Sequence, residues 1–486
     1  MTARPDSDCG CSRAVSGEGG VQVTLVHKLP AALTHFYPLP ALGSGVIPLY
    51  RGQFDGDGKR YRGTVSLALD PRPAIKATGV KNVTLDDLLA LDGSRGSAKW
   101  VVRPTVEVQS SAVPAPPKSA RIYSRGRPGT QRVSLDPSPI EVGTPTVVDE
   151  ITFFVINGWR ASDGLNTCYG GTDRPGRLEV QLDDWELRVE PRGDVSPLAI
   201  RDHMRATGQS TVTHVGRLRR TDLTDFSPSD ALQAIETVES LVSFALGRVT
   251  SILLPVGWHE GVAVWAQWSA LRAVDRPLGA APWLDGNATT AQLAELIRRG
   301  HSARQDPLRW EVFERALGYY FSSSFEATVT TKVMLPISAL QMLSFAHFVE
   351  VLPATDANHL SKKAWEALPT EEVVRRLLNE LNADFSVPSH LSHLGSVQAT
   401  IAATAQATPD GLRCIVKMRN DVAHPERTRL ARWSTYQWAE AGFLAMELFD
   451  LALLWWLGYE GRYMPRTAQH RSHDDSIAVP WLPTSP

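Results

Sequence analysis

The sequence predicts an α+β protein of more than one domain, in which a β-rich N-terminal region precedes an all-α helical bundle. From about 21 to 225, short β-branched runs are separated by Pro and Gly, which is typical of strands and turns. From about 290 to 460, apolar residues recur at helical spacing. We therefore expect a β-rich region at 21–290, a helical domain at 291–462 and a flexible or loosely docked tail at 463–486.

Composition excludes some classes of function. A chain of 486 residues can form two to four domains. Its formal net charge of −2 excludes coating of nucleic acid by bulk positive charge, so nucleic-acid contact would need a local patch. Cys9, Cys11, Cys168 and Cys414 lack zinc-site spacing, and we expect reduced thiols in a cytoplasmic protein. Residues 1–20 lack a secretory apolar run, and we expect a disordered tail there.

The N-terminal pattern favours a β-sandwich or barrel. Runs such as "ITFFVIN", "GRLEVQL", "WELRVEP" and "STVTHVGRLRR" predict strands, and the Pro-rich residues 110–120 predict a loop. After these runs, Ser227 is placed to cap a helix that Gly247 can end. Two further strand-like runs follow, "VTSILLPVGW" and "GVAVWAQWSAL".

Two groups of side chains in this region have a structural and a functional interpretation. For Trp258, Trp265 and Trp268 we favour packing in a core or on a sheet face over a ligand cage. The basic run Arg217, Arg219 and Arg220 is more often a polar strand face than a phosphate-binding surface.

Seven helical patterns with short connections predict the bundle. In the last of them, Ser434 and Gln437 form a capping box, and the helix is apolar nearly all round. Its stretch 441–458 is long enough to approach a membrane span, but it carries Glu447 and Asp450 near its middle. We therefore expect a buried helix, central in the bundle or covered by a second subunit, and no membrane.

The segment "KMRNDVAHPERTRL", residues 417–430, carries the candidate chemistry. Thr408, Pro409 and Asp410 are placed to start its helix. Arg419 falls on a stripe that we expect to face the core. The apolar members of this stripe are Leu412, Ile415, Val416, Val422 and Ala423. Because burying an unpaired guanidinium is costly, Arg419 must find a carboxylate or line a polar cavity.

His424 precedes Pro425, which disfavours helical geometry at the histidine, so the helix should end there. Two interpretations stay open. In the structural one, Arg419 pairs with a carboxylate of the bundle and His424 only ends the helix. In the functional one, the two residues offer a charged fork for phosphate and a group that titrates near neutrality.

Arg419, Asn420 and His424 follow the pattern of an arginine, a polar residue and a histidine after four intervening positions, which resembles the R-x4–6-H motif of the HEPN superfamily. The helical region looks most like the ApeA-type HEPN proteins of bacterial anti-phage defence. The resemblance covers about 300–460, and over the N-terminal half it is one of layout. In many of these relatives an acidic residue stands where this chain has Gln341, which can support the site only by hydrogen bonds.

The resemblance implies a metal-independent endoribonuclease that acts as a toxin in abortive infection. It implies His424 as general acid or base, Arg419 as phosphate clamp and Asn420 as an orienting residue. It also implies RNA as substrate, tRNA among the candidates, no cofactor and no metal, and a homodimer through the helical domain. The N-terminal region would then sense a phage-derived trigger or restrain the nuclease.

Nearby basic side chains are candidates for RNA binding, with solvated surface charge as the equal alternative: Lys417, Arg427, Arg429 and Arg432. Two other classes of function remain open. One is a non-catalytic HEPN dimer that binds a ligand or a partner protein. The other is a carbohydrate-binding or structural β-protein with a helical dimerisation domain. A solvent-open cleft shared by Arg419 and His424 would favour the nuclease.

Overall fold

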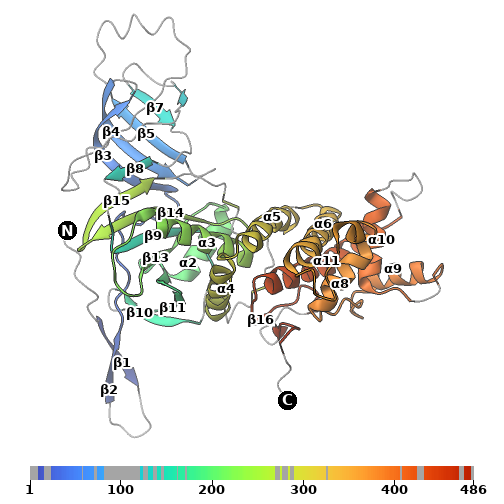
Figure 1. Cartoon of the computed structure of the whole chain (residues 1–486). Helices are drawn as coiled ribbons and strands as arrows, with labels where there is room; N and C mark the ends of the chain where they lie inside the picture. Colours follow the sequence, from blue (N-terminus) through green and yellow to red (C-terminus); the bar gives the residue numbers. More distant parts are fainter. Residues whose placement is uncertain are drawn as a thin grey trace, which may run out of the picture. The chain divides into compact units, whose positions relative to one another are not determined.

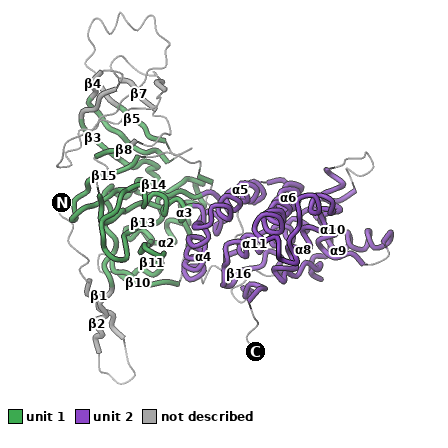
Figure 2. The backbone as a smooth tube through the Cα atoms, viewed as in Figure 1, with its two compact units in different colours: residues 1–239, 250–278 green, residues 240–249, 279–486 purple. Residues whose placement is uncertain are grey.

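A computed structural model gives a mixed α/β protein with a large antiparallel sheet in the N-terminal half and helices in the C-terminal half (Figure 1). This part of the prediction is confirmed. The chain divides into two compact units, one of residues 1–239 and 250–278 and one of residues 240–249 and 279–486 (Figure 2). The structure describes residues 9–15, 23–56, 59–69, 74–80, 121–123, 130–134, 140–143, 147–160, 163–169, 172–268, 274–275, 283–284, 289–324, 327–405, 408–423, 432–469 and 475–482.

An eight-stranded antiparallel sheet is the largest element of the first unit. Its strands are β8 (Ile140–Gly143), β9 (Glu150–Ile156), β10 (Leu165–Tyr169), β11 (Thr172–Leu182), β12 (Trp185–Pro191), β13 (Val212–Arg220), β14 (Ser251–His259) and β15 (Val262–Trp268). They lie in the order β10-β11-β12-β13-β9-β14-β15-β8. The sheet is open, with β10 and β8 at its edges, so the described strands do not form the barrel that the sequence pattern allowed.

The burial of this sheet follows from its sequence. Strand β9 is buried from Ile151 to Ile156, as expected for a continuous apolar run whose two faces are both covered. Helix α3 (Pro228–Leu246) lies against β14, because its Glu239 accepts hydrogen bonds from the Ser251 hydroxyl at 3.1 Å and the Ile252 amide at 2.7 Å.

Helix α3 has the ends that the sequence predicts. The Ser227 hydroxyl accepts a hydrogen bond from the Asp230 amide at 3.3 Å, and Gly247 takes a positive φ of 65° after the last turn. Helix α2 (Pro197–Thr207) was not predicted, although it has comparable signals. Ser196 caps it, and Gly208 follows it in the left-handed conformation.

A second sheet of the first unit contains β3 (Val46–Gly56), β4 (Lys59–Ala68), β5 (Ala74–Val80), β6 (Arg121–Tyr123) and β7 (Thr130–Ser134), in the order β3-β4-β5-β7-β6. Ile47, Val65 and Leu67 of this sheet belong to one hydrophobic cluster with Phe154 and Trp268 of the large sheet. The two sheets of this unit therefore share a core.

The expected disordered tail at 1–20 is wrong in part, because β1 (Cys9–Val15) pairs antiparallel with β2 (Val23–Leu29). The predicted Pro-rich loop at 110–120 and the strand-like run 99–109 lie outside the described residues. Cys168 and Cys414 are free and buried.

The second unit contains the predicted helices. They are α4 (Thr289–Ala303), α5 (Pro307–Ser324), α6 (Thr331–Phe345), α8 (Thr370–Glu380), α9 (Ser392–Ala402), α10 (Gly411–Ala423) and α11 (Thr435–Trp456), together with a short α7 (Lys362–Glu366). Helix α6 continues into a π-helical turn, Ala346–Val351. Helix α6 packs against α5, α8 and α11, which places α11 inside the bundle.

Helix α11 is the central helix that its composition predicts. Its N-terminus has the predicted capping box, in which Ser434 and Gln437 bond reciprocally. Every residue from Leu444 to Leu454 is buried within the chain itself. The apolar surface of this helix from Leu444 to Leu454 is therefore covered within the chain itself, and a homodimer now rests only on the family resemblance.

The expected flexible tail after residue 463 is corrected by the structure. Tyr463 and Met464 are buried, and the Met464 amide donates to the carbonyl of Trp283 at 2.6 Å. Strand β16 (Arg462–Tyr463) pairs with β17 (Ile477–Ala478), and the indole of Trp481 donates to the carbonyl of Tyr459 at 2.9 Å. The segments 463–469 and 475–482 are thus part of the second unit.

Among the described helices, one is long and apolar enough to cross a membrane, Thr331–Val351, and half of its apolar window is buried inside the protein. The buried core helix of a bundle meets the same criteria.

Candidate functional site

Two of the three predicted catalytic residues are described. Arg419 and Asn420 lie on the last turns of α10, which packs against α6, α8, α9 and α11. His424 lies outside the described residues, as do Arg427 and Arg429. Arg419 and Asn420 of the motif therefore lie near the C-terminal end of a helix that packs against four other helices.

Arg419 is not on the core-facing stripe. The buried face of α10 runs through Leu412, Ile415, Met418 and Asp421, whereas Arg419 lies beside it and is partly exposed. The predicted apolar stripe is rotated about the helix axis relative to the observed buried face, because Val422, which was assigned to the stripe, is only partly buried. The helix also starts later than expected. Asp410 caps it, and its Oδ1 accepts from the Arg413 amide at 2.9 Å.

The Arg419 guanidinium lacks an acidic partner among the described residues. Its Nη1 donates to Oδ1 of Asn420 at 3.1 Å, and its Nε is buried without a hydrogen-bond partner. An adjacent amide satisfies part of the donor fork and leaves the positive charge uncompensated. The expected bundle carboxylate for Arg419 is thus not found in the described part of the chain.

The carboxylate that sequence reasoning missed is Asp421, which is 1% exposed. Its oxygens accept from Nζ of Lys417 at 2.5 Å and from Nε1 of Trp433 at 3.0 Å, and Nη1 of Arg432 lies 3.8 Å away. Asp421 therefore joins residues on both sides of the segment 424–431. The four-residue spacing of Lys417 and Asp421 was the available signal.

The remaining predicted residues have different surroundings. Lys417, expected to bind RNA, is held by Asp421, and Arg432 also stacks over the ring of Trp433 at 4.6 Å. Gln341 lies partly buried on α6 and makes no hydrogen bond with Arg419 or Asn420 in the described structure. The predicted support of Arg419 by Gln341 is therefore not formed among these residues.

A second polar cluster fastens the C-terminal segment to α11. Asp450, 1% exposed, accepts from the Tyr320 hydroxyl at 2.7 Å and from Arg466, whose Nε and Nη2 lie 2.5 and 3.0 Å from its two oxygens. Burial and the charge of Asp450 raise the pKa of Tyr320. On the same helix, Glu447 accepts from the amide and the hydroxyl of Thr467 at 2.7 Å each, and burial raises its pKa.

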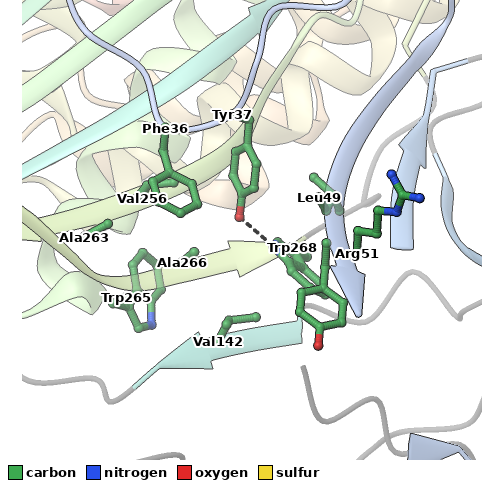
Figure 3. A pocket seen from close by; sticks show the side chains of 11 residues that line it. Phe36, Tyr37, Leu49, Arg51, Val142, Val256, Ala263, Trp265, Ala266 and Trp268 are labelled. Carbon is green, nitrogen blue, oxygen red and sulfur yellow. Dashed lines mark hydrogen bonds between the residues drawn. The ribbon is translucent and has the colours of Figure 1, made fainter. Parts of the chain in front are cut away.

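The tryptophans of the first unit pack as the structural interpretation predicts. Nε1 of Trp268 donates to the Tyr37 hydroxyl at 2.6 Å, and Nε1 of Trp258 donates to the Thr152 hydroxyl at 2.8 Å. Trp265 and Trp268 line a cavity of about 190 Å³ (Figure 3). This volume is below the roughly 300–1,000 Å³ of ordinary small-molecule sites, so the described surroundings favour packing.

The basic run on β13 is a polar sheet face, as favoured from the sequence. Arg219 and Arg220 pair with Glu186 and Asp184 at 2.7 and 2.9 Å, and Arg217 lies 3.5 Å from Glu150. With respect to metals, the described residues contain no group of three or more His, Cys, Asp or Glu side chains that could hold an ion.

Comparison with known proteins relates both halves of the chain to YopA proteins. Residues 143–279 match the model of the YopA central domain, and residues 306–476 match that of the YopA C-terminal domain. The SPbeta prophage-derived uncharacterized protein YopA of Bacillus subtilis (strain 168) is 23% identical over 442 residues, which cover 90% of this chain and 95% of that protein. No solved structure matches the chain. These descriptions name no activity and no ligand.

Proposed function

We propose that the helical unit is a HEPN-type, metal-independent endoribonuclease whose catalytic residues are Arg419, Asn420 and His424. One observation carries the proposal. Arg419 stands at the motif with a partly buried guanidinium that has no carboxylate partner among the described residues. An arginine kept for structure would be expected to find such a partner, since an uncompensated charge that is partly removed from water is costly.

Neighbouring residues of the same helix supply a contrast. Lys417 and Arg413 also lie on α10, and each pairs with a carboxylate: Asp421 at 2.5 Å and Glu371 at 2.9 Å. The carboxylate nearest in sequence to Arg419 is occupied by Lys417 and Trp433. The Arg419 guanidinium is a planar fork of N–H donors. A phosphate group of RNA would accept hydrogen bonds from this fork and balance its positive charge.

The proposed reaction uses the nucleophile of RNA itself. His424 takes the proton of the 2′-hydroxyl, the 2′-oxygen attacks the adjacent phosphorus, and the bond from phosphorus to the 5′-oxygen breaks. The leaving 5′-oxygen gains a proton, and the product is a 2′,3′-cyclic phosphate. Arg419 stabilises the charge that develops on the phosphate oxygens, and Asn420 orients Arg419 through the contact between them.

The wider role follows from the resemblance. We propose that the enzyme acts on RNA, with tRNA as one candidate, as a homodimer in the cytoplasm, and that it serves abortive infection. The N-terminal unit would sense a phage-derived trigger. The prophage-derived name of the Bacillus relative is compatible with a role in conflict between phages and bacteria. Arg427 and Arg429 would contact the RNA backbone. Lys417 already donates to Asp421, so its ammonium group would have to bind the RNA backbone and Asp421 at the same time.

Purified full-length protein on a mixed RNA pool tests the proposal. We expect cleavage by wild type, and a loss of about 10²–10⁴-fold in His424→Ala, which removes a general acid–base group. Arg419→Ala should lose activity to a similar degree. Arg413→Ala, on the same helix but paired with Glu371, is the matched control and should cleave normally. EDTA should leave cleavage unchanged.

Equal cleavage by wild type and His424→Ala would overturn the mechanism. Absence of cleavage by wild type, with or without phage extract, would favour the non-catalytic HEPN dimer that binds a ligand or a partner protein. Thermal melts of each variant show whether a lost activity reflects the site or the fold.

A further inference from the structure

A cavity of about 350 Å³ lies in the second unit, where α11, the residues after α8 and the C-terminal segment come together. This volume falls in the range of small-molecule sites. Its lining includes Glu447 and Leu451 of α11, Asp384 and His390 from the residues after α8, and Tyr463 of the C-terminal segment. The proposed nuclease residues do not line it, so its chemistry is separate from theirs.

Glu447 is a buried carboxylate with unused hydrogen-bonding capacity. It is 8% exposed, and its hydrogen bonds from the Thr467 amide and hydroxyl both go to Oε2. In the described structure Oε1 has no donor. Burial raises the pKa of Glu447, and the hydrogen bonds from Thr467 and the charge of Arg466 offset this effect only in part. A ligand in the cavity with an N–H or O–H donor would form a hydrogen bond with Oε1 of Glu447.

Tyr463 points to the same conclusion independently. Its side chain is 4% exposed and lines the cavity, yet its hydroxyl has no hydrogen-bond partner among the described residues. Burial, together with the negative charges of Glu447, Asp450 and Asp384, raises its pKa. A hydroxyl without a protein partner, in a cavity with two carboxylates, is available to a polar ligand.

Arg466 and His390 are basic side chains near the cavity that already have partners within the protein. Both oxygens of Asp450 bind Arg466, which also donates to Tyr320. His390 lines the cavity, but its Nε2 bonds the carbonyl of Thr467 at 2.5 Å. The buried Glu447 and the exposed Asp384 are thus the lining carboxylates without a basic partner among the described residues.

We propose that this cavity binds an aliphatic diamine. One ammonium group donates to Oε1 of Glu447 and to the Tyr463 hydroxyl oxygen, the second lies at Asp384, and the methylene chain packs on Leu451 and Pro465. A cavity whose lining holds two carboxylates together with apolar side chains suits two ammonium groups joined by methylenes. A metal ion fits less well, because the described residues offer no group of three acidic, histidine or cysteine ligands.

Calorimetric titration of the full-length protein with three matched ligands tests this site. The ligands are 1,4-diaminobutane, 1-aminobutane and 1,4-butanediol, which differ in charge and keep the same carbon chain. The diamine should bind at least tenfold more tightly than the monoamine, because it makes a second charge-assisted contact, and the diol should not bind. Equal binding of diamine and diol, or no binding of the diamine at millimolar concentration, would overturn the proposal.

Variants then locate the binding. Glu447→Gln keeps an oxygen for Thr467 and removes the charge, and it should weaken diamine binding at least tenfold. Glu440→Gln is the control. It changes a carboxylate of the same helix that accepts from the Leu394 amide at 2.7 Å and does not line the cavity. An equal effect of the two substitutions would place the diamine elsewhere and refute the site.

The ligand comparison on wild type needs no variant, so it decides the proposal even if Glu447→Gln is poorly folded. The binding is measured in the absence of RNA. Its outcome is therefore independent of whether the protein cleaves RNA.

Discussion

Replacing Asp450 by Ala should destabilise the helical unit strongly. Asp450 and Arg466 form a buried ion pair, with side-chain exposures of 1% and 9%, and Tyr320 donates to the same carboxylate. The substitution leaves the guanidinium of Arg466 buried without its charge partner and removes the acceptor of Tyr320. Because breaking one side of a buried ion pair leaves an uncompensated charge, we expect a loss of about 3–5 kcal/mol.

Urea unfolding of the full-length protein, followed by circular dichroism, measures this loss. With a slope of about 2 kcal/mol per molar urea, a loss of this size lowers the midpoint by about 1.5–2.5 M. Glu311→Ala is the control, because it breaks an ion pair with Arg315 in which both side chains are more than half exposed. That substitution should cost no more than about 1 kcal/mol.

The double variant Asp450→Leu with Arg466→Met tests the reason for the loss. It removes both charges and places apolar side chains in the same space, so most of the lost stability should return. A loss below about 1 kcal/mol in Asp450→Ala would refute the reasoning, since the pair would then behave like an exposed one. A double variant that is as unstable as the single one would show that Asp450 acts by packing.

Two further predictions concern other buried groups. Burial lowers the pKa of His214 to about 3, below its unfolded value of about 6.5, so its stabilising contribution is complete above pH 6.5 and is lost as pH falls towards 3. Between pH 6.5 and 5 the wild type should lose about 2 kcal/mol more than His214→Gln in urea unfolding, and parallel profiles would contradict this. Asp421→Ala should cost about 1–3 kcal/mol, because it leaves the buried Nε1 of Trp433 without an acceptor, and an unchanged melting temperature would contradict this role.

Local signals in the sequence predicted part of the architecture. The α3 helix begins and ends where Ser227 and Gly247 predict, and α11 has the capping box of Ser434 and Gln437. The change from alternating to helical apolar spacing separates the sheets from the bundle. These features depend on neighbours within about four residues, which a sequence displays directly.

The position of the candidate site in the helix was harder to predict. A stripe drawn through Val416 and Val422 assigned Arg419 to the core, whereas the buried face passes through Met418 and Asp421. Apolar and charged residues occur at neighbouring positions of this helix, so apolar spacing alone leaves more than one possible buried face. Contacts with α6, α8, α9 and α11 decide between them, and those contacts are absent from the local sequence.

By itself, then, the sequence determined the change from strands to helices, the capped ends of α3 and α11 and the arginine–histidine motif that resembles HEPN nucleases. The tertiary structure alone decided that Asp421 is the buried charge of α10, and that the segment after residue 463 is docked through the pair of Arg466 and Asp450. The cavity that Glu447 and Tyr463 line likewise exists only in the tertiary structure. The physical reason is that burial and ion pairing depend on distances between residues far apart in the chain, whereas strand and helix formation depend on the spacing of near neighbours.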